Sequence, residues 1–144
     1  MMDTTLKVVL AITLMAPLSL TTASQRGWTD NQCIATAIYY EARGEPLQGR
    51  RAVLDTITNR MLATGKSACY VIFQRGQFSW SKSKPIISYG FEQRDMMRQV
   101  VSHPTVLTSE NYRHFYSGRK PYWAYDMVCK KIKRQTFCKT KENI

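Results

Sequence analysis

The segment that begins at Trp28, "WTDNQCIATAIYYEARGEP", constrains the fold most, because it predicts one helix with both of its ends marked. Thr29 begins a capping-box pattern, which satisfies backbone N–H groups at the start of a helix. Gly44 suits the left-handed residue that often follows a last helical turn, and Pro46 prevents the helix from continuing. The pattern therefore predicts a helix over residues 30–43.

The apolar face of this predicted helix ends in a carboxylate. Ile34, Ala37 and Ile38 follow helical spacing, and the next position on the same face is Glu41. Burial and the negative end of the helix dipole both raise the pKa of a carboxyl group, which keeps a proton available for general acid catalysis of glycosidic bond cleavage. The alternative is a solvated Glu41 paired with a nearby arginine, and spacing alone favours this alternative.

The remaining chain predicts further helices and one hairpin. Residues 47–62 and 92–101 carry helical apolar faces, and residues 125–139 alternate as a β-hairpin does. Residues 70–74 fit either a short strand or a turn of helix. We expect polar or aromatic-rich loops elsewhere, at residues 75–85 and 110–123. The sequence thus predicts an α+β fold, mainly helical, in a single domain with a small C-terminal β-hairpin.

The chain is strongly basic, with a net charge of +11 from 21 Lys+Arg and 10 Asp+Glu. Residues 113–144 contain nine Lys/Arg and two acids, and therefore carry +7 of this charge. Such a charge attracts nucleic acid, an anionic membrane or anionic cell wall polymers, and charge alone does not choose among them.

The first residues resemble an export signal. Lys7 precedes the uncharged run "VVLAITLMAPLSL", and the small residues of "TTAS" follow it. We expect residues 1–23 to be a signal peptide cut after Ala23, and residues 24–144 to form the domain. The run is short for a transmembrane helix and contains Pro17, but its weak basic region leaves an uncleaved membrane signal as the alternative. The expected location is the periplasm or the exterior of the cell.

All four cysteines follow the expected cut, and export permits disulfides. Among the three possible pairings we favour Cys129–Cys138, because the eight intervening residues can form a hairpin, and Cys33–Cys69 by elimination. The chain has no C-x-x-C motif and no paired histidines. We therefore expect no metal and no other cofactor.

A longer stretch resembles a known family. "IATAIYYEARGEPLQGRRAVLDTITNRML" resembles the core motif of the bacterial and phage cell wall hydrolases typified by spore cortex-lytic enzymes. "CYVIFQRGQFSW" and the later segments "HFYSGRKPYWAYDMV" and "KIKRQTF" are similar to further blocks of that family, in the same order. The chain departs from the family at Gln135, where a histidine is usual, so any role of that histidine is in doubt here.

The resemblance implies a lysozyme-like catalytic domain that cuts the glycan strand of peptidoglycan. It implies lytic transglycosylation between N-acetylmuramic acid and N-acetylglucosamine, with Glu41 as the acid and base. Glu45 is a secondary candidate that a hydrolytic route would use; otherwise it is a loop residue bonded to backbone or to Arg43. Since no water must be activated in transglycosylation, one carboxylate suffices.

Aromatic and polar residues near these motifs are candidate sugar contacts, because sugar rings present apolar faces. The candidates for substrate binding are Tyr40, Arg43, Gln77, Phe78, Ser79, Trp80 and Tyr122. Phe78 fits a core position equally well.

Three functions fit the sequence, and we expect a monomer in each case. The first is the peptidoglycan lytic transglycosylase. Its favoured role is a phage endolysin, because the domain is small and basic and the N-terminal export signal is weak. The second is an inactive cationic protein that binds the cell wall or membrane on the same scaffold. The third, a nucleic-acid binder, rests on charge alone, and the chain has no nucleic-acid-binding motif.

Overall fold

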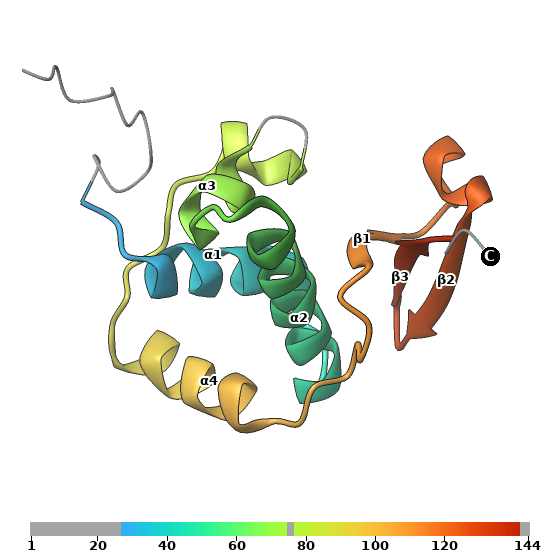
Figure 1. Ribbon diagram of the computed structural model, residues 1–144. Helices are drawn as coiled ribbons and strands as arrows, with labels where there is room; N and C mark the ends of the chain where they lie inside the picture. The colour runs from blue at the N-terminus through green and yellow to red at the C-terminus, as the bar shows by residue number, and fades with distance from the viewer. Residues whose placement is uncertain (1–26, 75–76, 142–144) are drawn as a thin grey trace, which may run out of the picture.

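The structure is a computed structural model that describes residues 27–74 and 77–141, so the expected signal peptide at residues 1–23 lies outside the described residues. Four α-helices pack together, and a small antiparallel sheet lies beside α2 (Figure 1). This arrangement confirms the mainly helical α+β fold. The elements are α1 (Asp30–Ala42), α2 (Leu47–Thr64), α3 (Ala68–Phe73), the 3-10 helix η2 (Ser79–Lys82), α4 (Phe91–Ser102), β1 (Tyr112–Ser117), the 3-10 helix η3 (Tyr122–Asp126), β2 (Met127–Ile132) and β3 (Gln135–Thr140).

The predicted boundaries of α1 are close to those observed, but the role of Gly44 was wrong. Thr29 caps α1 by accepting a hydrogen bond of 3.2 Å from the backbone N–H of Gln32. Gly44 does not adopt the left-handed conformation. A Cβ atom at this position would lie 3.1 Å from Nη2 of Arg134, so glycine gives the Arg134 side chain room to approach the backbone closely.

Two other segments test the expectations from the sequence: one decides between a strand and a helix, and the other forms a strand where a loop was expected. Residues 68–73 form the helix α3, whose N-cap Ser67 accepts from the N–H of Tyr70, so the strand alternative was wrong. The expected loop at residues 112–117 forms β1, which pairs with β3 in a sheet of order β1-β3-β2. The predicted hairpin is therefore part of a three-stranded sheet. Phe115 packs on Phe137 across this pair, and the partner strand lies too far along the chain for a local pattern to reveal it.

Buried polar residues of α2 place the sheet against the helices. Both oxygens of Asp55 are used, because Oδ1 pairs with Arg51 and Oδ2 accepts from the N–H groups of Val106 and Leu107. One turn further, the Asn59 amide donates to the carbonyls of Ser109 and Tyr112, and Nε of Arg60 donates to the carbonyl of Arg113. These bonds hold residues 106–113, which lead into β1, along α2 from Asp55 to Arg60.

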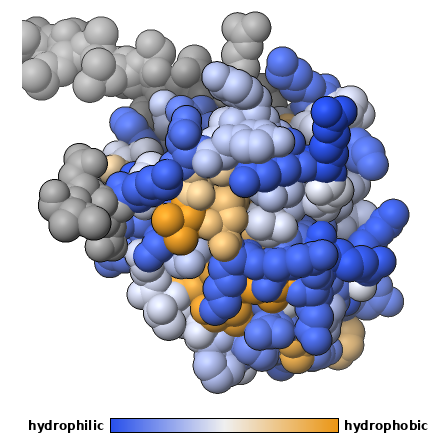
Figure 2. Space-filling view, turned by 90° about the vertical axis from the view of Figure 1, so that its right-hand side faces the viewer, coloured by the Kyte–Doolittle hydropathy of each residue, from blue (hydrophilic) through white to orange (hydrophobic). Residues whose placement is uncertain are grey.

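The side of the molecule on which the sheet lies is mostly hydrophilic, with hydrophobic residues gathered in a few small areas (Figure 2). The core contains large apolar side chains that are almost fully buried, among them Ile38, Ile57, Ile72 and Phe137. Among the described residues, none of the helices has the length and hydropathy needed to cross a lipid bilayer.

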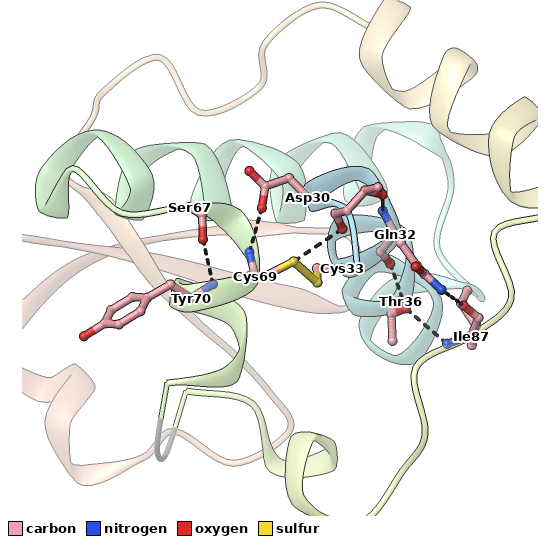
Figure 3. The surroundings of a disulfide bond; sticks show 9 residues. Asp30, Gln32, Cys33, Thr36, Ser67, Cys69, Tyr70 and Ile87 are labelled. Atoms are coloured by element: carbon pink, nitrogen blue, oxygen red, sulfur yellow. Dashed lines mark hydrogen bonds between the residues drawn. A yellow bond between two sulfur atoms is a disulfide. The ribbon is translucent and has the colours of Figure 1, made fainter. Parts of the chain in front are cut away.

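Two disulfides connect the pairs that the sequence analysis favours. Cys33–Cys69 joins the first turns of α1 and α3, next to a hydrogen bond of 3.1 Å from the N–H of Cys69 to Asp30 (Figure 3). Cys129–Cys138 joins directly opposed residues of β2 and β3. Both pairs favour an oxidising compartment.

The two disulfides predict unequal losses of stability. Cys33 and Cys69 are 36 residues apart and Cys129 and Cys138 are 9 apart, so the first bond restricts the unfolded chain more. We expect Cys33→Ala with Cys69→Ala to lower the free energy of unfolding by about 4 kcal/mol, and the Cys129→Ala, Cys138→Ala pair by about 3 kcal/mol. Urea unfolding followed by circular dichroism measures both, and the reverse order would contradict the loop-length argument.

Candidate functional site

The end of α1 is the structural centre of the candidate site. The last carbonyl groups of a helix lack partners within the helix and require donors from elsewhere. Arg50 of α2 supplies two of them, from Nε to the carbonyl of Ala42 at 3.3 Å and from Nη2 to the carbonyl of Arg43 at 2.7 Å. Its positive charge also lies at the negative end of the α1 dipole.

The turn between β2 and β3 supplies the other donors. Arg134 donates from Nη2 to the carbonyl of Gly44 at 2.7 Å, and Nε2 of Gln135 donates to the carbonyl of Glu41 at 3.0 Å. Lys133 has a φ of 54° in this tight turn, a left-handed conformation that residues other than glycine and asparagine seldom adopt. The turn therefore projects Arg134 and Gln135 onto the end of α1.

The carboxylate of Glu41 is half-buried and held by one specific donor. Nε1 of Trp80 donates to Oε1 of Glu41 at 3.0 Å. Burial raises the pKa of Glu41, while the Trp80 hydrogen bond and the charge of Arg60 lower it and only partly cancel the effect of burial. Glu41 therefore keeps its proton to a higher pH than an exposed glutamate does.

A cavity of about 310 Å³ is lined in part by Glu41. It brings together four residues predicted from the sequence, Tyr40, Glu41, Arg43 and Glu45, with others from the sheet. The sheet contributes Ser117, Arg134 and Gln135, and Gly44 completes the lining. Residues from α1, β1 and the start of β3, which are far apart in the sequence, thus meet around Glu41.

Two buried oxygens of this lining have no hydrogen-bond partner among the described residues. Arg134 occupies Oε1 of Glu45 at 3.0 Å, which leaves Oε2 without a donor. Gln135 is 3% exposed, its Nε2 is committed to Glu41, and its Oε1 is unpaired. Buried polar atoms in this state usually bind an ordered water or a ligand, so both oxygens can accept from a hydroxyl or amide group of a bound molecule.

A second hollow, of about 260 Å³, is lined by Arg60, Gln77, His114, Phe115, Trp123 and Met127. Burial lowers the pKa of Arg60 to about 10, while the charge of Glu41 acts to raise it, so Arg60 remains a cation at neutral pH. Burial and the charges of Arg60 and Arg113 lower the pKa of His114, which is therefore neutral near pH 7. The hollow therefore contains one buried positive charge that acts on Glu41.

The other predicted substrate contacts lie elsewhere. Phe78 and Trp80 are 3% and 5% exposed, so their rings belong to the core and do not form an open surface, which corrects that expectation. The two rings pack against each other at a centroid distance of 5.6 Å, tilted by 41°, and Trp80 reaches Glu41 through its Nε1–H. Ser79 is exposed at the start of η2, and Tyr122 lies outside the Glu41 cavity.

Three residues of the site had no assigned role from the sequence. Arg60 stood only within a motif, His114 seemed isolated, and Arg134 was one of many bases near the C-terminus. The position of Arg134 in the tight turn directly before Gln135 is the signal that could have indicated it. Within the described residues, no group of three or more His, Cys, Asp or Glu side chains could hold a metal ion.

Comparison with known proteins adds a family to this geometry. The sequence model of the family described as Cell Wall Hydrolase matches residues 44–138, beginning just after the helix that carries Glu41. The solved catalytic domain of the Bacillus cereus SleB protein is similar in fold, with a TM-score of 0.61 and 26% identity, over 76% of this chain and 89% of that one. Among curated proteins, no sequence matches the chain.

The Trp80 hydrogen bond predicts a shift in the titration of Glu41. Trp80→Phe keeps an aromatic ring but removes the N–H donor that stabilises the ionised carboxylate, so we expect the pKa of Glu41 to rise further. Carbon-13 NMR of the glutamate carboxyl groups measures this pKa. Phe73→Leu is the control, because Phe73 packs on the Trp80 ring at 6.0 Å and has no hydrogen bond to Glu41. An equal shift in both variants would show that packing is responsible.

Glu41 also predicts how stability depends on pH. Its folded pKa is above the ordinary value of 4.5, so as pH rises the unfolded chain loses this proton first and the folded state loses relative stability up to the folded pKa. Glu41→Gln has no such proton to lose. We therefore expect the stability of Glu41→Gln relative to the unmodified protein to increase from pH 4 to pH 7 in urea unfolding. A constant difference would indicate a solvated Glu41.

Proposed function

The chain belongs to the cell wall hydrolase family, and from this premise we propose that it cleaves the glycan strand of peptidoglycan with Glu41 as the general acid. One observation carries the proposal. Glu41 is a half-buried carboxyl with a raised pKa, fixed by Trp80 at the edge of a cavity. A general acid requires this combination of a retained proton, a fixed orientation and access to substrate.

The first step is proton transfer to the glycosidic oxygen between N-acetylmuramic acid and N-acetylglucosamine. Trp80 occupies Oε1, so Oε2 of Glu41 is the atom that presents the proton. As the bond breaks, its electron pair goes to the leaving oxygen, and positive charge develops on the muramic ring in an oxocarbenium-like transition state. Glu41 becomes an anion, which the buried charge of Arg60 and the Trp80 N–H stabilise.

The second step is the one that defines a lytic transglycosylase. Ionised Glu41 takes the proton of the C6 hydroxyl of the same sugar, and the C6 oxygen bonds to the anomeric carbon. The product has a 1,6-anhydro end, and Glu41 recovers its starting proton. The unpaired Oε1 of Gln135 in the same cavity is available to accept from a substrate hydroxyl or amide during both steps.

Glu45 is the candidate for the hydrolytic route, in which a water would attack instead. Arg134 engages one of its oxygens, and the other is buried without a partner. Arg134 engages one of the two oxygens that would have to activate a water, so the geometry favours the one-glutamate mechanism over a two-carboxylate one.

The second candidate function is an inactive cationic protein that binds the cell wall or the membrane. The replacement of the family's usual histidine by Gln135 favours it, as does the charge of residues 113–144. The observed role of Gln135 supports the enzyme instead, because the amide donates to the carbonyl of Glu41 and so holds the acid in place.

The proposed location is outside the cytoplasm, in the periplasm or beyond, where peptidoglycan lies. The two disulfides support export. We further propose a signal peptide at residues 1–23, a monomeric domain at residues 24–144 and a role as a lysis enzyme of the endolysin type.

Glu41→Gln is expected to reduce release of soluble fragments from purified peptidoglycan by at least about 100-fold, because general acid catalysis typically contributes that much. Mass spectrometry of the products tests the mechanism, and 1,6-anhydro ends are expected. Reducing muramic ends would indicate hydrolysis and make Glu45 the second catalyst.

Two controls separate the roles of the glutamates. Glu92→Gln changes an exposed carboxylate of α4 and is expected to leave activity unchanged. Glu45→Gln is expected to lower activity less than Glu41→Gln does. Full activity of Glu41→Gln, or cleavage within the stem peptides, would overturn the proposal.

A further inference from the structure

We propose that residues 119–125 form a second, non-catalytic binding site for the glycan strand of peptidoglycan and its acidic stem peptides. The identity of this ligand rests on the proposed function. The site lies between β1 and β2, around a hollow of about 610 Å³ that is separate from the Glu41 cavity. Its lining is entirely aromatic, basic or proline, namely Arg119, Lys120, Pro121, Tyr122 and Tyr125.

The aromatic side chains of this site are unusually open to solvent. Tyr122 is 94% exposed and Tyr125 is 64% exposed. They flank one hollow, and such a cluster of exposed aromatic side chains is a common mark of a binding surface. The Tyr122 ring and the face of the Tyr125 ring opposite Lys120 can stack on the apolar faces of sugar rings, which Phe78 and Trp80 are too buried to do.

The segment is held in a defined conformation, so binding need not order it. Ala124 is fully buried, and its N–H donates to the carbonyl of Pro121 at 3.1 Å. The ring of Trp123 lies 5.6 Å from His114 and 5.8 Å from Tyr116, which fixes η3 on β1. A preorganised platform of this kind lowers the entropic cost of association.

The charges of the site favour an anionic ligand. Nζ of Lys120 lies 4.5 Å from the centre of the Tyr125 ring, beside Arg119, while Asp126 is the only acid in residues 113–141. Stem peptides carry carboxylates at regular intervals along the glycan. A ligand that alternates sugar rings with carboxylates matches both components of this surface.

A lipid bilayer fits the same surface less well. Membrane-inserting surfaces present large apolar side chains that enter the acyl region, whereas residues 119–125 contain no Leu, Ile or Phe and their one Trp, Trp123, packs against His114 and Tyr116. The side of the molecule that carries the sheet is also mostly hydrophilic (Figure 2). The observations therefore favour a polysaccharide.

The second site lies next to the catalytic region. Trp123 belongs to the same 3-10 helix as Tyr122 and Tyr125, and it lines the hollow that contains Arg60. Arg60 in turn acts electrostatically on Glu41. We infer that a long glycan strand bound at Glu41 also reaches η3, which a short fragment does not.

Binding is tested in the Glu41→Gln background, so that cleavage does not remove the ligand. We expect Tyr122→Ala with Tyr125→Ala to weaken co-sedimentation with insoluble peptidoglycan by about tenfold, which corresponds to about 1.4 kcal/mol. Tyr70→Ala is the matched control. Tyr70 of α3 is also exposed, and Nζ of Lys66 lies 5.4 Å from the centre of its ring, much as Nζ of Lys120 lies 4.5 Å from that of Tyr125. Control and double variant should unfold at the same urea concentration as the parent.

Activity of the chain with Glu41 intact provides the second readout. We expect the double variant to lower kcat/KM on polymeric peptidoglycan through KM, and to leave kcat/KM on a fragment of two disaccharides unchanged. Equal binding of the double variant and the Tyr70→Ala control to peptidoglycan would overturn the proposal. Equal losses on polymer and fragment, or lost binding only to vesicles of anionic phospholipid, would also overturn it. Because binding is measured without cleavage, these outcomes are distinct from a failure of Glu41 as the acid.

Discussion

The free carbonyl groups at the end of α1 are the constraint on which the site depends. A helix that ends inside a protein must find donors for these groups, and here the donors come from α2 and from the turn between β2 and β3. Each donor also fixes a neighbour of Glu41 in space. The requirement that completes the helix thus positions the acid, and it brings the sheet against the helical part of the fold.

The chemistry of Glu41 arises from a balance between burial and compensation. Burial alone would make the ionised form costly, whereas the Trp80 N–H and the Arg60 charge make it accessible once a proton has left. A carboxyl that is only buried would hold its proton too firmly to act as a base. A carboxyl that only had a positive charge and a hydrogen-bond donor beside it would have a low pKa and would be ionised before the substrate binds. The observed combination permits both directions of proton transfer.

Local sequence patterns predicted much of the helical part, and long-range contacts account for what they missed. The cap at Thr29 and the apolar face ending at Glu41 are properties of neighbouring residues, which a sequence displays directly. The β1 strand was missed because its pairing with β3 joins distant segments. Gly44 was misinterpreted for the same reason, since Arg134 approaches it from 90 residues away. The site was predictable as an acid at a helix end, but its electrostatic partners were not.

The turn residue Arg134 and the first residue of β3, Gln135, have a consequence for the order of assembly. The Gln135 bond to the Glu41 carbonyl spans 94 positions, and the Arg134 bond to Glu45 spans 89. Contacts between such distant positions form late, after the local helices. A growing chain therefore acquires its helices well before its acid is held in place. The end of α1 therefore lacks these two donors until the chain has been made through β3, which ends at Thr140.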